Sequence, residues 1–443
     1  MHIFRFIFLI CVPLFSQKVE TNIKSLDSTQ IKLILDSLLK EQSSISLEYH
    51  LKSYDVYNNI SNYKIKDSGK VADSLILICD NYFSDKTIKH ILQPFENIFI
   101  GTQYSILCQD LSEKYYFINE IPSFQYRLFR EQNLAALLFI EPKFNSFLTG
   151  SFGLSKINNQ LDFIGELDLD IENFSGNAEQ HKIFWKKNKD ISQVIKLRTF
   201  HPHILGTEIG AFFQYDFENY NSFFTKSEKK IMLHTFLPIL NNFKVGYLRG
   251  KILSTKSGQE SGYVNGDYLA ISLNSDLDKR NDRLLPSSGK YFKLMVDGGV
   301  DKKLMYFKTN FEYQLFLHVK GNIYTKIQTV SHNINYLDGA VPKSRYFKLG
   351  GSSSLRGVNE ESLLKSQFYI FTLEFIQQQK RKMQIKSFID LGLNKFTNLK
   401  EYLYGYGFGI KNVNDKTIFS IDYSLNSHEW ENGKIHFKWS ARL

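Results

Sequence analysis

The sequence is poor in cysteine and proline, and beyond its first residues it has no long hydrophobic run. With 3 cysteines among 443 residues it cannot be a disulfide-dense scaffold, and no Cys/His spacing typical of a zinc site occurs. No later window offers about 18 uninterrupted apolar residues, which excludes a transmembrane-helix candidate. The 8 prolines contrast with 38 phenylalanines and 25 tyrosines, so the chain is rich in aromatic residues instead.

The positive charge is spread along the chain rather than gathered in one block. The 55 Lys and Arg residues outnumber the 45 Asp and Glu residues, giving a net charge of +10. A long basic block of the kind that binds nucleic acid is absent, so no nucleic-acid partner is predicted. The densest cluster, Lys380–Lys382, follows three glutamines and is interpreted as a solvated turn between strands, with a phosphate-binding patch as the alternative.

The first 16 residues have the pattern of a secretory signal peptide. A weakly basic start precedes the apolar run Phe6–Phe15, and Ser16 is a small residue suited to the position before cleavage. A short buried N-terminal helix is the alternative. The mature chain would begin near Gln17 and keep Cys79 and Cys108, which could form a disulfide in an oxidising periplasm or remain two separate thiols.

Residues 17–142 mix helical and strand patterns. A hydrophobic stripe predicts a helix over 27–41, and weak alternation predicts an irregular strand pair over 45–66, so residues 17–69 form an N-terminal helix and a partial domain. Residues 70–142 predict a small α+β domain with the order strand, helix, helix, strand, strand. The three strands are expected at Ser74–Cys79, Phe124–Leu128 and Leu134–Ile140. The first helix is expected to start at a cap formed by Ser84 or Asp85 and to end before Pro94, and the second helix is expected at Tyr104–Tyr115.

That order resembles the POTRA domain, a periplasmic module that can bind extended peptides by adding a strand to its sheet edge. The segment at 17–69 is interpreted as partly POTRA-like as well. A generic α+β adaptor without a peptide role is the alternative.

From Lys143 to Leu443, alternation of apolar and polar residues replaces helical periodicity. Clear examples lie at 161–171, 211–217, 307–317 and 435–443. Such alternation over about 300 residues predicts a transmembrane antiparallel β-barrel of about 16 strands, preceded by the small α+β domain. A soluble β-sandwich array or a propeller is the alternative. The last strand must seal the barrel, because lipid cannot satisfy free backbone groups.

Three short motifs in the last third of the chain suggest a loop held inside such a barrel. Gly350–Gly357 is a loop of small residues that carries one arginine, Arg356. Glu374 and Asp390 follow in segments of strand-like composition. A lone arginine and two strand-borne carboxylates suggest a loop tied by charge to the barrel wall.

A POTRA-like domain followed by such a barrel resembles the outer-membrane assembly family of BamA and TamA, also called the surface-antigen barrels. The resemblance runs from about residue 70 to the end and rests on four motifs. Asp282, Pro286 and Gly289 match its D-x-x-x-P-x-x-G stretch, Leu355, Arg356 and Gly357 its V-R-G-F/Y loop tip, Phe388, Asp390 and Gly392 its F-x-D-x-G strand, and the strand with Phe437, Trp439 and Leu443 its C-terminal signal. Val358 and Leu443 stand where the family commonly has an aromatic residue.

The resemblance implies that Arg356 folds into the lumen and meets Asp390, with Glu374 as a second candidate. The planar guanidinium stays charged and suits a carboxylate partner. An exposed loop arginine is the alternative. The resemblance also implies a lateral seam between the strands at Ser146–Phe152 and Ile435–Leu443.

The function implied is non-enzymatic. The barrel would help outer-membrane β-barrel precursors insert, or would move an exported partner polypeptide across the outer membrane, with the N-terminal domain in the periplasm of a bacterial cell. Its partners would be outer-membrane lipid, unfolded client polypeptides and accessory assembly lipoproteins. A single module preceded by a short segment favours a specialised member of the family over its essential one.

Two other function classes stay open. A passive porin-like solute channel would need neither the periplasmic domain nor an arginine-tipped loop. An outer-membrane enzyme would need a nucleophile with a base, but the 11 histidines are scattered and no Gly-x-Ser-x-Gly elbow occurs. His201 and His203 could form a metal pair, although a turn around Pro202 is the simpler interpretation. No catalytic residue, metal or cofactor is therefore predicted.

Overall fold

The protein was analysed as a computed structural model that describes residues 20–24, 47–58, 60–67, 71–98, 104–129, 133–157, 160–187, 192–237, 240–351, 354–380, 382–394, 402–426 and 433–443. The predicted leader and the predicted helix at 27–41 lie outside these ranges. The chain divides into two compact units. The smaller one comprises residues 1–76, 94–107 and 124–138, and the larger one comprises residues 77–93, 108–123 and 139–443.

Two three-stranded sheets precede the barrel in the chain and share one strand order. The first contains β1 (Glu20–Lys24), β2 (Leu47–Asp55) and β3 (Ile60–Asp67), and the second contains β4 (Ser74–Ile78), β5 (Ser123–Phe129) and β6 (Asn133–Phe139). In both sheets the third strand is central, and the first and second strands are edges. The predicted strand pair at 45–66 is confirmed as β2 and β3, whose register shifts between Leu51 and Ser53.

The helices between β4 and β5 are α2 (Asp85–Leu92), the short 3-10 helix η1 (Gln93–Phe95) and α3 (Tyr104–Lys114). Ser84 caps α2, because its hydroxyl accepts a hydrogen bond from the backbone N–H of Thr87 at 3.4 Å, as the sequence predicts. Cys79 and Cys108 are both free thiols, which matches the second of the two interpretations left open above. No helix in the described ranges is long and apolar enough to cross a bilayer.

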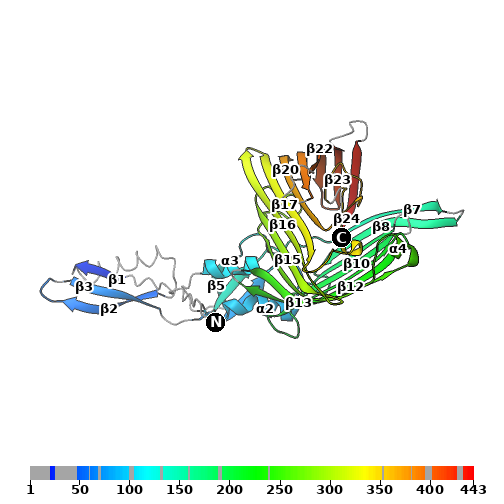
Figure 1. Cartoon of the computed structure of the whole chain (residues 1–443). Coiled ribbons are helices and arrows are strands. Elements are labelled where there is room, and N and C mark those ends of the chain that lie inside the picture. The colour runs from blue at the N-terminus through cyan, green and yellow to red at the C-terminus, as the bar shows by residue number, and fades with distance from the viewer. Residues whose placement is uncertain are drawn as a thin grey trace. The chain divides into compact units, whose positions relative to one another are not determined.

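The alternating segments form a closed antiparallel barrel of sixteen strands, as predicted (Figure 1). Its strands are β7 (Phe147–Ile157), β8 (Gln160–Glu172), β9 (Gln180–Lys187), β10 (Gln193–His201), β11 (Gly210–Tyr220), β12 (Phe224–Leu237), β13 (Asn241–Ser254), β14 (Gly266–Asp278), β15 (Gly289–Asp301), β16 (Leu304–Lys320), β17 (Ile323–Tyr336), β20 (Gln367–Gln379), β21 (Met383–Leu393), β22 (Tyr402–Val413), β23 (Thr417–Asn426) and β24 (Lys434–Arg442). β24 pairs with β7 and closes the cylinder. We call the end at which β7 begins and β24 ends the proximal end.

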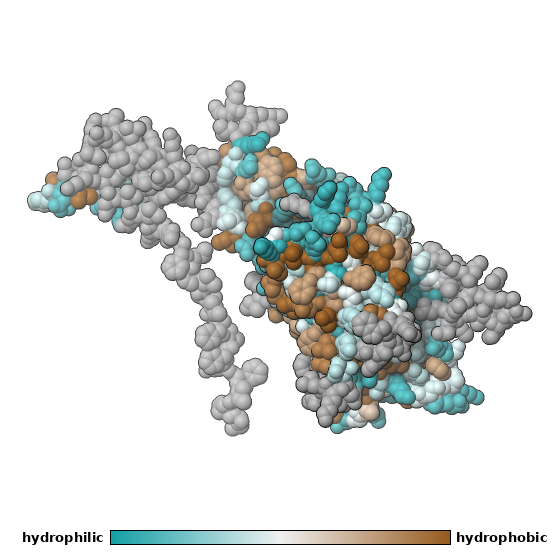
Figure 2. All heavy atoms as spheres, turned by 90° about the horizontal axis from the view of Figure 1, so that it is seen from above, coloured by the Kyte–Doolittle hydropathy of each residue, from teal (hydrophilic) through white to brown (hydrophobic). Residues whose placement is uncertain are grey.

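The barrel wall is apolar outside and mostly polar inside. On β14, Leu269, Ile271 and Leu273 are exposed on the outer face, whereas Ser272 and Asn274 are buried on the inner face. Figure 2 shows hydrophobic residues gathered over one face of the barrel wall. This is the pattern that a bilayer selects, because the outward side chains must replace contacts with water by contacts with lipid.

The connection between β13 and β14 contains the one-turn helix α4 (Lys256–Glu260). Thr255 starts this helix, because its hydroxyl accepts a hydrogen bond from the N–H of Gly258 at 3.1 Å. A single turn is too short to show a helical period in the sequence.

The connection between β17 and β20 is long and carries structure of its own. We call residues 337–366 the long loop. It contains the 3-10 helix η2 (Lys343–Arg345) and a two-stranded sheet of β18 (Phe347–Leu349) and β19 (Leu363–Lys365). Between β18 and β19 lies the Gly-Ser segment that ends in Arg356.

Candidate functional site

The side chain of Arg356 is held by two carboxylates of the barrel wall. Its Nε and Nη2 donate to the two oxygens of Asp390, each at 2.7 Å, and Nη1 donates to Glu374 Oε1 at 2.8 Å. The backbone N–H of Arg356 also donates to Asp390 at 3.2 Å, and the guanidinium lies 3.4 Å from the ring centroid of Phe388. Asp390 is 0% exposed and Arg356 6% exposed, so this is a buried, bidentate ion pair.

The neighbours of this pair balance its charge. Thr372 donates to Asp390 at 2.8 Å, and Lys326 Nζ lies 3.6 Å from Glu374 Oε2. Two carboxylates therefore face two cations on β17 and the long loop. A buried cluster of this kind is stable only while each charge keeps its partner. A charge that lost its partner would be left in the interior without water to solvate it.

Glycines let the loop tip lie directly on the wall. A Cβ at Gly405 on β22 would lie 1.8 Å from the carbonyl oxygen of Arg356, and one at Gly392 would lie 3.0 Å from Leu355. Gly357 has φ +89°, a conformation that favours glycine. Gly357 and Gly392, the glycines of two predicted motifs, are therefore explained by the same feature, the close approach of the long loop to the barrel wall.

Leu355 adds an apolar contact to the charged one. It is fully buried and packs in a cluster with Leu349, Phe368 and Ile370. The predicted tether residues Arg356, Asp390 and Glu374 are therefore brought together in the structure, while their importance for function stays a prediction.

A second arginine of the long loop is also buried against the wall, and the sequence analysis missed it. The guanidinium of Arg345 on η2 lies 3.6 Å from the ring centroid of Tyr268 and 4.3 Å from that of Tyr306. Its Nη1 lies 3.6 Å from Asp301, which accepts a hydrogen bond from Tyr336 at 2.6 Å. The long loop is thus anchored at two arginines, on β14–β17 and on β20–β21.

The predicted D-x-x-x-P-x-x-G stretch forms the connection between β14 and β15 at the proximal end. We call residues 279–288 the proximal turn. Asp282 Oδ1 accepts hydrogen bonds from the N–H groups of Leu284 at 2.7 Å and Leu285 at 2.9 Å, which folds the turn. Gly289 has φ +97°, and a Cβ there would lie 1.9 Å from the carbonyl oxygen of Lys279.

The proximal turn reaches across the mouth of the barrel. The carbonyl oxygen of Pro286 accepts a hydrogen bond from Gln384 on β21 at 3.0 Å, and that of Leu284 accepts one from Lys411 on β22 at 2.6 Å. In the wall, β16, β17 and β20 stand between β15 and β21. These contacts therefore pass through the lumen rather than along the wall.

The seam between the first and last barrel strands is short. β24 and β7 pair at two positions, Ala441 with Leu148 and Arg442 with Phe147. The neighbouring pairs are longer, with eight positions between β23 and β24 and eleven between β7 and β8. The N–H of Leu443 adds one hydrogen bond to the carbonyl oxygen of Ser146 at 3.0 Å. Figure 1 shows that, away from the proximal end, β7 and β8 diverge from β24.

The predicted seam side chains lie on the outer face of β24. Phe437, Trp439 and Leu443 are 63%, 46% and 69% exposed. On the inner face, the hydroxyls of Ser440 and Thr149 lie 2.5 Å apart across the seam. Among the residues that the structure describes, the part of β24 before Ala441 has no register partner on β7, and its outward side chains are apolar.

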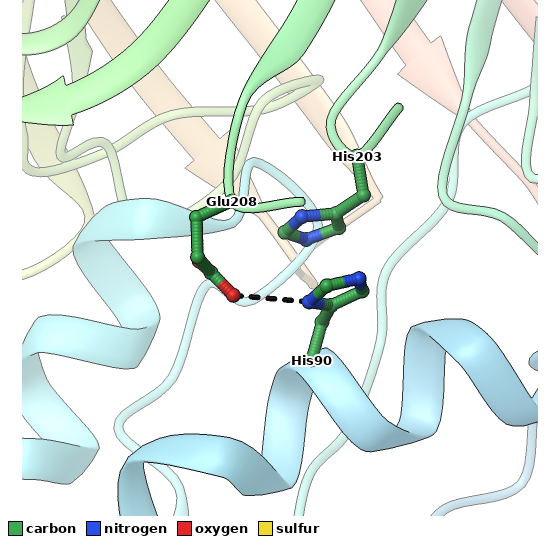
Figure 3. A group of neighbouring side chains, drawn as sticks. All are labelled: His90, His203 and Glu208. Carbon is green, nitrogen blue, oxygen red and sulfur yellow. Dashed lines mark hydrogen bonds and ion pairs between the residues drawn. The ribbon is translucent and has the colours of Figure 1, made fainter. Parts of the chain in front are cut away.

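Histidines are brought together at the proximal end, but in a pairing that the sequence did not suggest. His203 lies in the turn between β10 and β11 and stacks on His90 of α2, with ring centroids 4.1 Å apart and planes within 7° (Figure 3). His90 Nδ1 donates to Glu208 Oε1 at 3.0 Å. His201, which the sequence analysis considered as a metal pair with His203 but interpreted as part of a turn, contacts His181, with ring centroids 5.6 Å apart.

The nitrogen and oxygen atoms of His90, His203 and Glu208 lie within 4.8 Å of one another, close enough to ask whether they could hold a metal. The arrangement does not fit one. The lone pairs lie in the planes of the two rings, which are nearly parallel with centroids 4.1 Å apart, so they do not converge on one point about 2.0–2.1 Å from each nitrogen. His203 Nε2 accepts from the hydroxyl of Tyr115 at 2.8 Å, and Nδ1 lies 3.1 Å from the carbonyl oxygen of Thr207.

The cluster instead fastens the turn at 202–209 to α2 and α3 by hydrogen bonds. Lys114 forms an ion pair with Glu208 and completes it. Burial, aided by the neighbouring His90, lowers the pKa of His203 to about 4, so this ring is neutral at ordinary pH. A neutral ring is what the hydrogen bond from Tyr115 requires, because Nε2 must accept.

Comparison with known proteins agrees with this architecture. Residues 173–437 match the family model described as the Omp85 superfamily domain. The chain belongs to the Omp85 superfamily. The resemblance to BamA and TamA stated from the sequence is thereby confirmed at the level of family, and membership implies an outer-membrane barrel that assembles or translocates polypeptide.

Solved structures show the same fold at low sequence identity. A structure of BamA from Haemophilus ducreyi lacking POTRA domains 1–3 has a TM-score of 0.54 and 12% identity, and the match covers 94% of this Omp85 chain and 93% of that one. CdiB from Acinetobacter baumannii has a TM-score of 0.57 and 11% identity, with 94% and 82% covered. CdiB from Escherichia coli has a TM-score of 0.56 and 11% identity, with 94% and 84% covered. No curated protein sequence matches the chain.

Two wall and loop residues of this Omp85 barrel escaped the sequence analysis for different reasons. Gly405 could have been found, because Gly405, Gly407 and Gly409 alternate along one strand, and such glycines mark a face that another backbone approaches. Arg345 carried no such signal, because its partners Tyr268, Asp301 and Tyr306 come from three separate strands.

Proposed function

We propose that this protein inserts β-barrel precursors into the outer membrane or translocates a dedicated polypeptide across it, using the β24–β7 seam as the site where a client strand engages. Residues 70–142 act as a POTRA-like periplasmic domain that delivers the client. The long loop, tethered through Arg356 to Asp390 and Glu374, holds the barrel wall in shape beside the seam.

The two-position pairing of β24 with β7 is the observation that carries the proposal. A strand edge with unsatisfied N–H and C=O groups is a template for another strand. Inside lipid this tendency is stronger, because no water competes for those groups. A client β-hairpin that pairs with the free part of β24 would satisfy them.

The N-terminal domain supports delivery by the same chemistry. In its sheet β6 is central, so β4 and β5 are edge strands of that sheet. An extended peptide could add to either edge as a further strand. Ser123–Phe129 alternates apolar and polar residues, which suits an edge that offers side-chain pockets at every second position.

A passive porin-like channel is the alternative, and the lumen argues against it. The long loop is anchored inside through Arg345 and Arg356, and the proximal turn bonds to β21 and β22 across the mouth. A porin needs an open aqueous path. Conductance that is unchanged after deletion of residues 20–142 would favour the channel over the proposed function.

The first experiment is depletion of the protein followed by a quantitative inventory of outer-membrane proteins. Loss of many β-barrel proteins supports general insertion, and loss of one exported partner supports dedicated translocation. An unchanged inventory would contradict both.

The second experiment locks the seam. In a background with Cys79→Ser and Cys108→Ala, the pair Thr149→Cys and Ser440→Cys should form a disulfide across the seam, because the native hydroxyls lie 2.5 Å apart. Oxidation should abolish client assembly, and reduction should restore it.

The matched control places the same crosslink at a fully paired boundary. Asn310 on β16 and His332 on β17 are register partners. Oxidising Asn310→Cys with His332→Cys should leave assembly intact. If locking the seam has as little effect as this control, the seam is not where clients engage.

A further inference from the structure

Arg283 of the proximal turn makes the most extensive contacts of any side chain in that turn. Its Nη1 and Nη2 donate to the two oxygens of Glu172, each at 2.9 Å, and Nη2 also donates to the carbonyl oxygen of Lys143 at 2.6 Å. Turned so that its oxygen faces the guanidinium, the Asn145 amide accepts from Nε at 3.2 Å and Nη2 at 3.0 Å. The guanidinium also lies 5.4 Å from the ring centroid of Tyr116.

These partners hold the segment that leads into the seam. We call residues 143–146 the lead-in to β7. Glu172 Oε2 accepts from the N–H of Asn145 at 2.7 Å, and the N–H of Glu172 donates to the hydroxyl of Ser146 at 2.9 Å. The carbonyl oxygen of Ser146 in turn accepts from the N–H of Leu443. The two residues of β7 that pair with β24 follow immediately.

The contact is made between distant parts of the barrel. Glu172 ends β8, and Arg283 follows β14, while β9 to β13 stand between those strands in the wall. Arg283 therefore reaches the lead-in across the proximal mouth. The lead-in is also bonded on its other side, where the N–H of Lys143 donates to the carbonyl oxygen of Phe117 at 2.8 Å.

A simple surface ion pair would not have these properties. Glu172 and Arg283 are both largely buried, and the fork geometry uses both oxygens and both terminal nitrogens. A lysine at this position could supply the charge. It could not make the bidentate contact with Glu172 and also donate a hydrogen bond to the carbonyl oxygen of Lys143.

We propose that Arg283 is a positioning residue for the seam: it fixes the lead-in against β8 and thereby sets how often β7 is in register with β24. The position of the proximal turn is then coupled to seam closure. A client that displaces the turn from the mouth would withdraw Arg283 and free the β7 side of the seam. The importance of this coupling for clients rests on the proposed function, but the coupling itself does not.

The test measures seam geometry without any client. In the purified full-length protein, the rate of disulfide formation between Thr149→Cys and Ser440→Cys reports how often the two strands meet. Arg283→Gln should slow this rate roughly fivefold or more, the effect of losing about 1 kcal/mol of positioning. The crosslink between Asn310→Cys and His332→Cys on β16 and β17 should form at an unchanged rate.

Arg280→Gln is the matched control, since Arg280 lies in the same turn but pairs with Asp278 and does not contact the lead-in. It should leave the seam crosslink unchanged. Arg283→Lys should restore the rate in part. Glu172→Gln, which keeps the shape of the side chain but removes its charge, provides a second variant should Arg283→Gln fail to fold, and it should slow the seam crosslink as well.

An unchanged seam rate in the folded Arg283 and Glu172 variants would overturn the inference. So would an equal slowing at the seam and at β16–β17, which would show general loosening of the barrel. A specific effect on the seam crosslink, combined with client assembly that stays normal when the seam is locked by oxidation, would keep the inference and contradict the proposed function, so the two failures are distinguishable.

Discussion

Replacing Arg356 by alanine should release the tip of the long loop from the wall while leaving the barrel itself folded. The substitution removes three side-chain hydrogen bonds to carboxylates and leaves Asp390, which is fully buried, without its main cationic partner. Breaking a buried pair in this way costs about 3–5 kcal/mol, which lowers the ratio of docked to released loop roughly a hundredfold or more.

Thermolysin provides a direct assay, because it cleaves before large apolar residues and Leu355 is fully buried when the loop is docked. Arg356→Ala should expose Leu355 to cleavage, whereas the barrel strands should stay resistant. Lys348→Ala is the control, since Lys348 is a second loop cation that pairs with Glu218 away from the tip.

Assembly activity in cells should fall more than protein abundance, and Asp390→Arg should act in the same direction. Arg356→Lys should be intermediate, because lysine keeps the charge but loses the fork. If Leu355 stays protected in folded Arg356→Ala protein, or if both variants support full assembly, the tether does not hold the loop as argued.

Three further changes test other contacts. Arg345→Ala should expose the η2 part of the long loop to protease, since it removes cation–π contacts worth about 2 kcal/mol when desolvated, and unchanged cleavage would rule out a second anchor. Gly405→Ala should reproduce the protease pattern of Arg356→Ala with Arg356 intact, because its Cβ would meet the loop backbone at 1.8 Å; normal protection would show that the loop can shift without release. Acidification should loosen the turn at 202–209. The pKa of His203 is lowered from 6.5 to about 4 in the folded protein, so the stabilisation of the turn by the neutral His203 ring is complete above pH 6.5 and is lost as pH falls toward 4. Hydrogen exchange in that turn should rise over this range, and His203→Gln should remove the pH dependence.

The sequence predicted those features that depend on local pattern. Alternation along each strand predicted the barrel, because every strand must present one face to lipid and one to the lumen. The Ser84 cap was predictable for the same reason, since it is formed by a hydrogen bond within a few residues.

Features that depend on register or on distant contacts could not be predicted in this way. The strands of the seam were located from the sequence, but the length of their pairing depends on how β7 diverges from β24. Arg283 lies inside a predicted motif and was passed over, because its partners at 143–146 and 172 come close only when the barrel closes. His90 of α2 and His203 of the turn at 202–209 are likewise far apart in the sequence and meet only in the folded chain.

The proximal turn has a consequence for membrane permeability. A barrel of this size in the outer membrane would leak small solutes if nothing filled it. Here the proximal turn and the long loop obstruct the lumen at separate places, through Gln384 and Lys411 in one case and through Arg345 and Arg356 in the other. The proximal turn and the long loop connect strands at opposite ends of the barrel, so displacing the turn leaves the long loop in place. A client that moves the proximal turn from the mouth, as proposed above, would therefore meet a lumen in which the long loop is still held by Arg345 and Arg356.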